Sequence, residues 1–172
     1  METIVLGGGC FWCTEAIYRM VKGVSKVTSG YAGGKTKNPT YGEVSTGRTG
    51  HAEVVKIEFN PKIVKLERLL GIFFASHDPT QPNRQGNDIG TQYRSAVFFT
   101  NETQRKGVDK FISEKQLELD GKIVTEVKPL LEFYPAEEVH ESFFEKNPYS
   151  PYCTLIIRPK MEKVRREFGI GK

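Results

Sequence analysis

Gly7-Gly8-Gly9-Cys10-Phe11-Trp12-Cys13-Thr14-Glu15 is the stretch that decides the fold of this chain. The β-branched run just before it, Thr3 to Leu6, predicts a short buried strand. Three glycines between a strand and a helix allow a tight turn and leave room for a ligand. Just after them, apolar side chains recur at helical spacing and predict a helix that begins near Cys10; these are Trp12, Ala16, Ile17, Met20 and Val21.

Cys10 falls where the unpaired amide N–H groups of this helix and the positive end of its dipole converge. Such a position stabilises a thiolate and lowers the pKa of a cysteine below its usual value of about 8.5. Each pKa unit corresponds to about 1.4 kcal/mol, so a shift of a few units leaves the thiol mostly ionised at neutral pH. We therefore expect Cys10 to be a nucleophile.

The length and composition are those of a single globular domain, residues 1–172, that is long enough to bury a core without disulfides. The hydrophobic content is 38%, and no apolar run approaches the roughly 20 residues of a membrane-spanning helix. The first residues lack the basic-then-apolar order of a secretion signal. We expect a cytoplasmic, monomeric protein that does not associate with membranes.

The charge and cysteine content narrow the class of function further. Three cysteines, an odd number, favour catalysis or redox chemistry over structural disulfides. The net charge is +4, with basic residues gathered near the C-terminus. Because Glu162 and Glu167 interrupt them, they indicate a solvated helix face, and we expect no nucleic-acid partner.

The rest of the chain alternates strands and helices. We expect strands at residues 24–31, 51–59, 95–100 and 124–127, and helices at 66–74, from Asn101 as the N-cap, and at 161–168. Three shorter segments are expected to be an extended piece at 41–46, a helix start at 136–138 and a Pro/Tyr-rich loop at 147–153. This order predicts an α/β two-layer domain with a central mixed sheet and flanking helices.

Two segments lack periodicity and are expected to serve function rather than packing. Residues 77–92 make a loop too long for a plain connection, and such loops are usually functional or mobile. The C-terminal segment from about residue 147 carries Cys153, and we expect it to be flexible.

Cys10-x-x-Cys13 places two sulfurs on one side of a helix, where they can close a disulfide. A general thiol–disulfide oxidoreductase uses the same spacing, but normally in a Trp-Cys-x-x-Cys order and a longer βαβ context. A zinc site needs about four ligands, and the chain has no second cysteine pair. An inert buried thiol is an alternative for Cys13 or Cys153, but not for a cysteine that follows three glycines.

Four motifs occur in a fixed order: Gly9-Cys10-Phe11-Trp12, Gly50-His51-Ala52-Glu53, Asp88-Ile89-Gly90-Thr91-Gln92-Tyr93-Arg94-Ser95 and Phe133-Tyr134-Pro135-Ala136-Glu137-Glu138-Val139-His140. In that order and at similar separations they resemble the A-type peptide methionine sulfoxide reductases, from about Thr3 to Cys153. The resemblance implies reduction of the S epimer of methionine sulfoxide, free or in oxidised proteins. It also implies thioredoxin or another thiol as the reductant and no metal or organic cofactor. For the fold we expect a ferredoxin-like plait with extended loops.

The resemblance also implies roles for individual residues. A sulfoxide is reduced by a thiolate, a proton donor and hydrogen bonds that hold its oxygen beside that donor. Cys10 matches the family's nucleophile, and Glu53 matches its acid, whose pKa must be raised for it to be protonated near neutrality. Tyr41 and Tyr93 match the two hydroxyls that bind the sulfoxide oxygen.

The remaining matches concern the substrate pocket. Asp88 matches a polar residue of that pocket, and Phe11 with Trp12 matches the apolar wall that receives the S-methyl group. Without the motifs, Asp88 would be interpreted as a turn former, Trp12 as a core residue, and Tyr41 and Tyr93 as aromatic residues at the edge of the core.

Glu53 without its motif would be interpreted as a solvent-facing strand residue. The histidines receive no catalytic role: we expect His51 and His140 to make structural hydrogen bonds and His77 to cap the preceding helix.

Turnover leaves Cys10 as a sulfenic acid, and a second thiol must condense with it before thioredoxin reduces the resulting disulfide. Many family members have glycine where this chain has Cys13, and their resolving cysteine lies in a C-terminal loop that Cys153 resembles. We expect Cys153 to resolve the sulfenic acid, while Cys13 and a relay through both thiols stay open. Glu141 also departs from the family, because many relatives have glutamine there.

Overall fold

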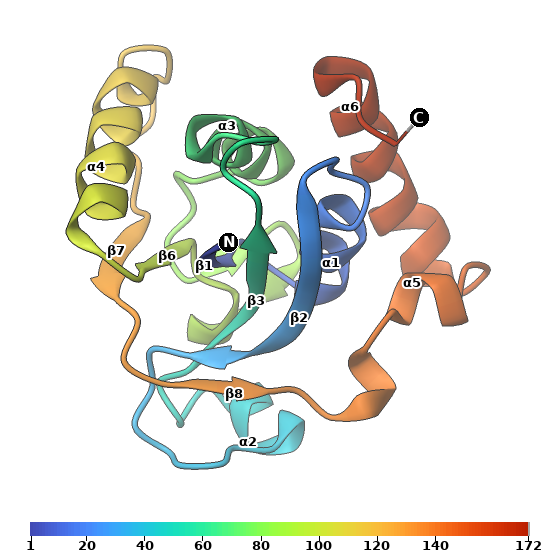
Figure 1. Ribbon diagram of the computed structural model, residues 1–172. Helices are drawn as coiled ribbons and strands as arrows, with labels where there is room; N and C mark the ends of the chain where they lie inside the picture. Colours follow the sequence, from blue (N-terminus) through green and yellow to red (C-terminus); the bar gives the residue numbers. More distant parts are fainter. Residues whose placement is uncertain (172) are drawn as a thin grey trace.

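The computed structural model describes residues 1–171 (Figure 1). Its elements follow one another as β1 (Glu2–Gly7), α1 (Phe11–Tyr18), β2 (Val24–Ala32), α2 (Tyr41–Ser45), β3 (Ala52–Phe59), α3 (Leu66–Ser76), β4 (Arg84–Gln85), β5 (Asp88–Ile89), η1 (Thr91–Tyr93), β6 (Ala96–Phe99), α4 (Glu102–Gln116), β7 (Glu126–Pro129), β8 (Phe133–Pro135), η2 (Glu138–His140), α5 (Phe143–Lys146), η3 (Cys153–Ile157) and α6 (Arg158–Phe168).

Six strands form one sheet in the order β7-β6-β1-β3-β2-β8. β1 pairs antiparallel with both β3 and β6, and β2 pairs antiparallel with β3. β7 runs parallel to β6, and the short strand β8 runs antiparallel to the end of β2 at the opposite edge. The predicted α/β fold with a central mixed sheet is therefore confirmed.

The helices gather on one side of this sheet. Side chains of β1 alternate, so that Ile4 and Leu6 join the large core shared with α1, α3, α4 and α6, while Val5 joins a smaller cluster on the other face. Figure 1 shows α2 apart from these helices, beyond β8 at the bottom of the view. The chain thus leaves the centre of the sheet at the end of β1 and enters α1 with Cys10 at the junction.

The turn between β1 and α1 requires glycine for two separate reasons. Gly9 has φ of +88°, a conformation that side chains disfavour. A Cβ on Gly8 would lie 3.0 Å from the ring of His77. That ring is buried, with Nδ1 2.6 Å from the carbonyl oxygen of Phe73 and Nε2 2.7 Å from the hydroxyl of Ser95. The glycine turn is therefore packed against a fixed imidazole, and α1 begins at Phe11, as predicted.

Three predicted boundaries differ from the structure. Residues 41–45 form helix α2 rather than an extended piece, because Thr40 and Glu43 cap its start reciprocally. β7 begins at residue 126 rather than 124, and the helical turn predicted from residue 136 begins at Glu138 as the 3₁₀ turn η2. The Thr-x-x-Glu signal of the capping box is present in the sequence, so only this first error was avoidable.

The C-terminal segment differs more. The predicted loop over 147–153 is wrong in its last residues, since helical structure begins at Pro151 and Cys153 is the first residue of the π-helical turn η3. The terminal helix then starts at Arg158 rather than at residue 161. Cys153 is fully buried in a cluster with Cys13, Ala16 and Ile157. A π-helical turn widens the helix locally, a departure that 3.6-residue periodicity does not reveal.

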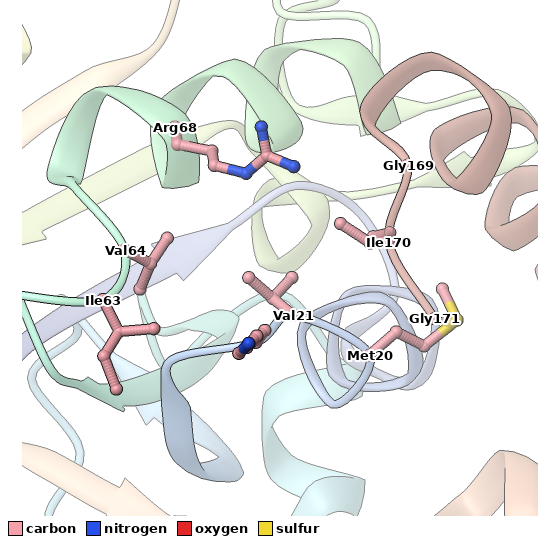
Figure 2. Close-up of a pocket in the computed structure, with 9 residues that line it drawn as sticks. Met20, Val21, Ile63, Val64, Arg68, Gly169, Ile170 and Gly171 are labelled. Carbon is pink, nitrogen blue, oxygen red and sulfur yellow. The ribbon is translucent and has the colours of Figure 1, made fainter.

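The far end of α1 borders a hollow of about 370 Å³ (Figure 2). Figure 2 shows Met20 and Val21 beyond α1, Ile63 and Val64 before α3, and Ile170 near the C-terminus around this space. It lies at the opposite end of α1 from Cys10, so it takes no part in the site described below. Among residues 1–171, no helix is both long enough and apolar enough to cross a membrane.

Candidate active site

Cys10 is the N-cap residue of α1, and its side chain makes no capping hydrogen bond to the helix. The residue is 9% exposed, so its sulfur lies just beneath the surface. The first amide of the helix, Phe11 N–H, does not point to a solvent molecule but donates to the carboxyl group of Glu53 over 3.2 Å. The sequence-predicted nucleophile and acid are therefore brought together through one backbone amide.

Glu53 is a buried acid on β3, directly opposite Tyr31 of β2 in the strand register. It is 1% exposed, although strand alternation alone would place it toward solvent. Burial raises the pKa of Glu53 to about 8; the Phe11 amide opposes this shift, and the negative charge of Asp88 adds to it. Glu53 therefore carries its proton at neutral pH, as a general acid must.

The two sequence-predicted tyrosines lie beside this acid. Tyr41 is the first residue of α2 and Tyr93 the last residue of η1, and both are partly exposed. Burial raises the pKa of each, and the charge of Glu53 is the second largest cause in both cases. Cys10 and Asp88 also act on both phenols. Five separate segments thus deliver their polar groups to one place, and both phenols stay protonated hydrogen-bond donors at neutral pH.

Trp12 and Phe11 form an aromatic wall next to the acid. Trp12 is partly exposed, whereas Phe11 is almost fully buried behind it, with ring centroids 6.5 Å apart. Phe11 also stacks against Tyr41 at 6.4 Å. Trp12 is the member of the pair that presents its side chain outward, and Phe11 supports the wall from inside.

The sequence-based expectation of a depressed pKa at Cys10 is wrong for the substrate-free protein. Burial raises the pKa of the Cys10 thiol well above its usual range, and the charge of Glu53 raises it further. The Trp12 amide and the Tyr152 hydroxyl lower it, but less than burial raises it. The eight-residue helix α1 does not outweigh the removal of the sulfur from water, so the resting side chain is a protonated thiol.

The other two thiols lie deeper along the same side of α1. Cys13 is 3% exposed, and its amide bonds to the carbonyl oxygen of Cys10 over 3.2 Å. Cys13 and Cys153 belong to one apolar cluster, and each is a free thiol. Cys13 thus neighbours both other cysteines, because its amide bonds to Cys10 and its side chain shares an apolar cluster with Cys153.

Tyr152 is a site residue that sequence reasoning missed. Its hydroxyl donates to the carboxylate of Asp88 over 2.9 Å and lies 4.0 Å from the sulfur of Cys13. Its pKa is raised by burial and then by the charges of Cys10 and Cys13. The only signal in the sequence was that Tyr152 directly precedes Cys153. A tyrosine in a predicted loop does not indicate that its hydroxyl lies beside the cysteine sulfurs.

A further group surrounds the aromatic wall, and it includes the structural hydrogen bond expected of His140. Trp12 donates its indole N–H to Nδ1 of His140 over 3.1 Å, and His140 stacks against Tyr41 with ring centroids 4.4 Å apart. Glu137 accepts from the Tyr31 hydroxyl at 3.0 Å and from the Tyr41 amide at 2.9 Å. Both acceptors come from the fourth motif, so its residues fix the tryptophan and the start of α2.

Comparison with known proteins gives one consistent result. The family model of peptide methionine sulfoxide reductase matches residues 2–170. The chain is 53% identical to the peptide methionine sulfoxide reductase MsrA of Psychrobacter cryohalolentis, covering 98% of this chain and 97% of that protein. It is also 53% identical to MsrA of Saccharolobus solfataricus, covering 98% and 95%.

Solved structures agree with these sequence matches. The reduced form of Mxr1 from Saccharomyces cerevisiae superposes with a TM-score of 0.84 at 38% identity, covering 88% of each chain. Methionine sulfoxide reductase A of Corynebacterium diphtheriae also gives 0.84, at 39% identity, covering 88% of this chain and 78% of that one. A match of this kind over nearly the whole length, with a thiol, a protonated acid and two phenols in one place, identifies the chain as a member of the peptide methionine sulfoxide reductase family.

Proposed function

We propose that this chain reduces the S epimer of methionine sulfoxide, free or in oxidised proteins, at the site formed by Cys10, Glu53, Tyr41 and Tyr93. One observation carries the proposal. The amide of Phe11, the residue after Cys10, donates to the buried carboxyl group of Glu53, which is protonated at neutral pH. A sulfoxide needs both groups, because its sulfur becomes a good electrophile only when its oxygen gains a proton.

The acid and the phenols act on the sulfoxide oxygen. Tyr41 and Tyr93 donate hydrogen bonds to it, since burial keeps both phenols protonated. Glu53 then gives its proton to the same oxygen. Because these donors are fixed on three different elements before substrate arrives, they stabilise the developing charge without reorganising.

The thiol attacks as the oxygen is protonated. The positive charge on the protonated sulfoxide favours the ionised form of the neighbouring Cys10, which offsets the burial that keeps the resting thiol protonated. The Cys10 sulfur bonds to the substrate sulfur, and the thiol proton passes to the carboxylate that Glu53 has become. The hydroxyl group then passes to Cys10 as the substrate S–O bond and the transient sulfur–sulfur bond break, so that a thiol and a sulfoxide yield a sulfenic acid and a thioether.

The aromatic wall selects the epimer. Trp12, supported by Phe11, offers an apolar surface for the S-methyl group, and Asp88 with the Tyr152 hydroxyl borders the polar side. Once the oxygen is held by the phenols and the methyl group by the indole, only one configuration at sulfur leaves that sulfur open to Cys10, because the other configuration places the rest of the substrate there.

The sulfenic acid is resolved by a relay through both remaining thiols. Cys13 attacks Cys10, releasing water and forming a Cys10–Cys13 disulfide. Cys153 then attacks Cys13, which returns Cys10 to a thiol and leaves a Cys13–Cys153 disulfide for thioredoxin or another thiol to reduce. The placement of Cys13 supports this sequence of steps, since its amide bonds to Cys10 and its side chain packs in the cluster that holds Cys153. The chemistry calls for no metal or organic cofactor.

Two solved structures of one relative support a mobile recycling step. Against the reduced form of yeast Mxr1 the TM-score is 0.84, but against its unusual oxidised form it is 0.67 at the same 38% identity. A third structure contains Mxr1 in complex with Trx2. For this chain we propose that the C-terminal segment from about residue 147, with the buried Cys153, leaves its place on α1 during recycling.

The remaining features of the proposal concern the whole chain. We propose a monomeric, cytoplasmic protein with one catalytic domain over residues 1–172. Its central strands, in the order β6-β1-β3-β2, form a ferredoxin-like plait, with β7 and β8 added at the edges. The helices that follow β1 and β3 both contribute to the core on the same face, which supports this description.

One experiment tests the function directly. Wild-type protein, reduced beforehand, is mixed with one equivalent of methionine-S-sulfoxide without added reductant, and the methionine formed is counted. We expect about one methionine per chain from wild type and none from the Cys10→Ser variant, with the R epimer as the negative control. Reduction of insulin disulfides by the wild type, without reduction of the sulfoxide, would instead establish a general thiol–disulfide oxidoreductase.

A further inference from the structure

Glu15 is a buried acid that the chemistry above does not use. It lies on α1, three residues after Trp12, and is 1% exposed. Its carboxylate accepts a hydrogen bond from the Ser142 amide over 2.9 Å. Arg19 lies beside it, with Nε 3.4 Å from the carboxylate. A buried carboxylate bonded to a backbone amide fixes the segment that supplies that amide.

The segment that Glu15 holds has an unusual backbone. Ser142 has φ of 54° and ψ of 37°, the left-handed region that residues other than glycine seldom adopt. Such a conformation persists only when the surroundings determine it. The Ser142 side chain does not cap the short helix α5 that follows, and the Ser142 amide instead donates to the carboxylate of Glu15.

Phe143, the first residue after this turn, lies directly on the candidate substrate wall. Its ring stacks on Trp12 with centroids 3.6 Å apart and planes inclined by 5°. The Trp12 indole is therefore held by a ring on its face and by His140 at its N–H. The same short segment supplies both contacts, and Glu15 ties that segment back to the helix that carries Trp12.

We propose that Glu15 is a positioning residue, which keeps Phe143 stacked on Trp12 and so fixes the indole in the orientation that receives the substrate S-methyl group. This inference rests on the proposed function of Trp12. It concerns substrate binding rather than the chemical step, because the Glu15 carboxylate bonds to Ser142 and Arg19, whereas Cys10 and Glu53 are joined through the Phe11 amide.

The single tryptophan of the chain makes the proposal measurable without substrate. In Glu15→Ala, we expect red-shifted Trp12 fluorescence and faster quenching by acrylamide, because Phe143 no longer covers the ring. We expect KM for methionine-S-sulfoxide to rise about tenfold, the usual effect of losing one buried hydrogen-bonded contact, with kcat changed less than about threefold. Glu15→Gln keeps an acceptor oxygen for the Ser142 amide and should restore most of both properties.

A matched control and a double-mutant cycle separate positioning from general stabilisation. Arg19→Gln removes the ion pair with Glu15 but leaves the hydrogen bond from the Ser142 amide, so fluorescence and KM should stay near wild type. If Glu15 acts through Phe143, adding Glu15→Ala to Phe143→Ala should raise KM little further, whereas independent effects would multiply. If Glu15→Ala does not fold, the same cycle is run with Glu15→Met, which fills similar space without an acceptor for the Ser142 amide.

Unchanged Trp12 fluorescence in a folded Glu15→Ala variant would overturn the inference, as would multiplied KM effects in the cycle. Failure of the wild type to reduce methionine-S-sulfoxide would instead overturn the proposed function. The fluorescence of the substrate-free variants would then still decide whether Glu15 holds Phe143 on Trp12.

Discussion

Cys10 and Cys153 are both buried thiols, but they are buried in opposite ways. Cys10 ends the turn after the central strand β1, and its neighbours are the polar groups of Glu53 and Tyr152. Cys153 opens the π-helical turn η3 near the C-terminus, and its neighbours are apolar, Ala16 and Ile157 among them. The sheet fixes the position of the Cys10 thiol, and charged neighbours shift its pKa. The Cys153 thiol packs in an apolar cluster.

This difference separates the two halves of a catalytic cycle. The reacting groups come from β3, α1, α2 and η1, whose positions depend on the core of the sheet. The recycling thiol sits on a segment that packs on α1 through apolar contacts and is joined to β5 by the hydrogen bond from Tyr152 to Asp88. A π-helical turn is uncommon and tends to mark functional positions. The groups that react with the sulfoxide can thus stay preorganised while the segment that carries Cys153 leaves α1.

The largest expected effect is the loss of thioredoxin-dependent cycling when Cys13 or Cys153 is replaced singly. Both Cys13→Ser and Cys153→Ser should still form about one methionine per chain, because Cys10 and Glu53 are untouched. Both should lose thioredoxin-dependent cycling. In the relay, however, Cys13→Ser stops at the Cys10 sulfenic acid, which dimedone traps, whereas Cys153→Ser stops at a Cys10–Cys13 disulfide.

Mass spectrometry after one equivalent of substrate distinguishes these products. A dimedone adduct in Cys153→Ser, or a Cys10–Cys153 disulfide in Cys13→Ser, would show that Cys153 resolves the sulfenic acid directly. Continued cycling of Cys153→Ser at the wild-type rate would remove that residue from the mechanism altogether.

The next largest effect concerns the chemical step alone, and it is tested by replacing Glu53 on β3. Glu53→Gln keeps the size of the side chain and an acceptor for the Phe11 amide but cannot donate an acidic proton. The single-turnover rate should fall by a factor on the order of 10²–10⁴, the usual contribution of a general acid. In the wild type, that rate should fall as pH rises through about 8, because Glu53 then loses its proton.

This pH dependence has a simple control. The rate of Glu53→Gln should lack the decline near pH 8 and show only changes due to other groups. A wild-type rate that stays flat from pH 6 to 10 in single-turnover stopped-flow experiments would assign the proton to another donor.

The smallest effect is on stability and has a definite sign. The pKa of Glu53 is about 8 in the folded chain against an ordinary value of 4.5, so between these pH values the folded state binds more protons than the unfolded state. Stability therefore falls as pH rises through this window, by up to about 1.4 kcal/mol per pH unit from this group alone. Glu53→Gln should melt at a higher temperature than wild type at pH 9 and show a smaller difference at pH 5.

Calorimetry of both proteins across that range measures the difference. An equal Tm difference at pH 5 and pH 9 would contradict a buried, protonated Glu53. A higher Tm together with a slower reaction would mean that the active site holds an acid at the expense of stability.

Sequence patterns predicted the surroundings of Cys10 and Glu53 better than those of Cys153. The glycine turn, the start of α1 and the strand carrying Glu53 follow from local periodicity, and the motifs indicated Tyr41 and Tyr93. Each of these residues lies on an element with a strong local signal or within a specific motif. The structure brings all of them together around Glu53.

The errors have physical causes that a local pattern does not contain. The pKa of Cys10 is decided by burial under segments distant in sequence, such as that of Tyr152, and not by the helix dipole alone. The π-helical turn at Cys153 is stabilised by packing against α1, which no spacing within residues 147–157 reveals. Glu15 acts on a turn 127 residues away. Tertiary contacts, rather than propensities, decided these three positions.

A protonated resting Cys10 has a consequence for when the enzyme works. Peroxide and other oxidants consume cysteines according to their exposure and thiolate character. With 9% exposure and a raised pKa, Cys10 is a poor target for these oxidants until a bound sulfoxide favours its thiolate form. The oxidants that convert methionine to its sulfoxide therefore react slowly with Cys10 itself, and the thiol remains available to reduce that sulfoxide.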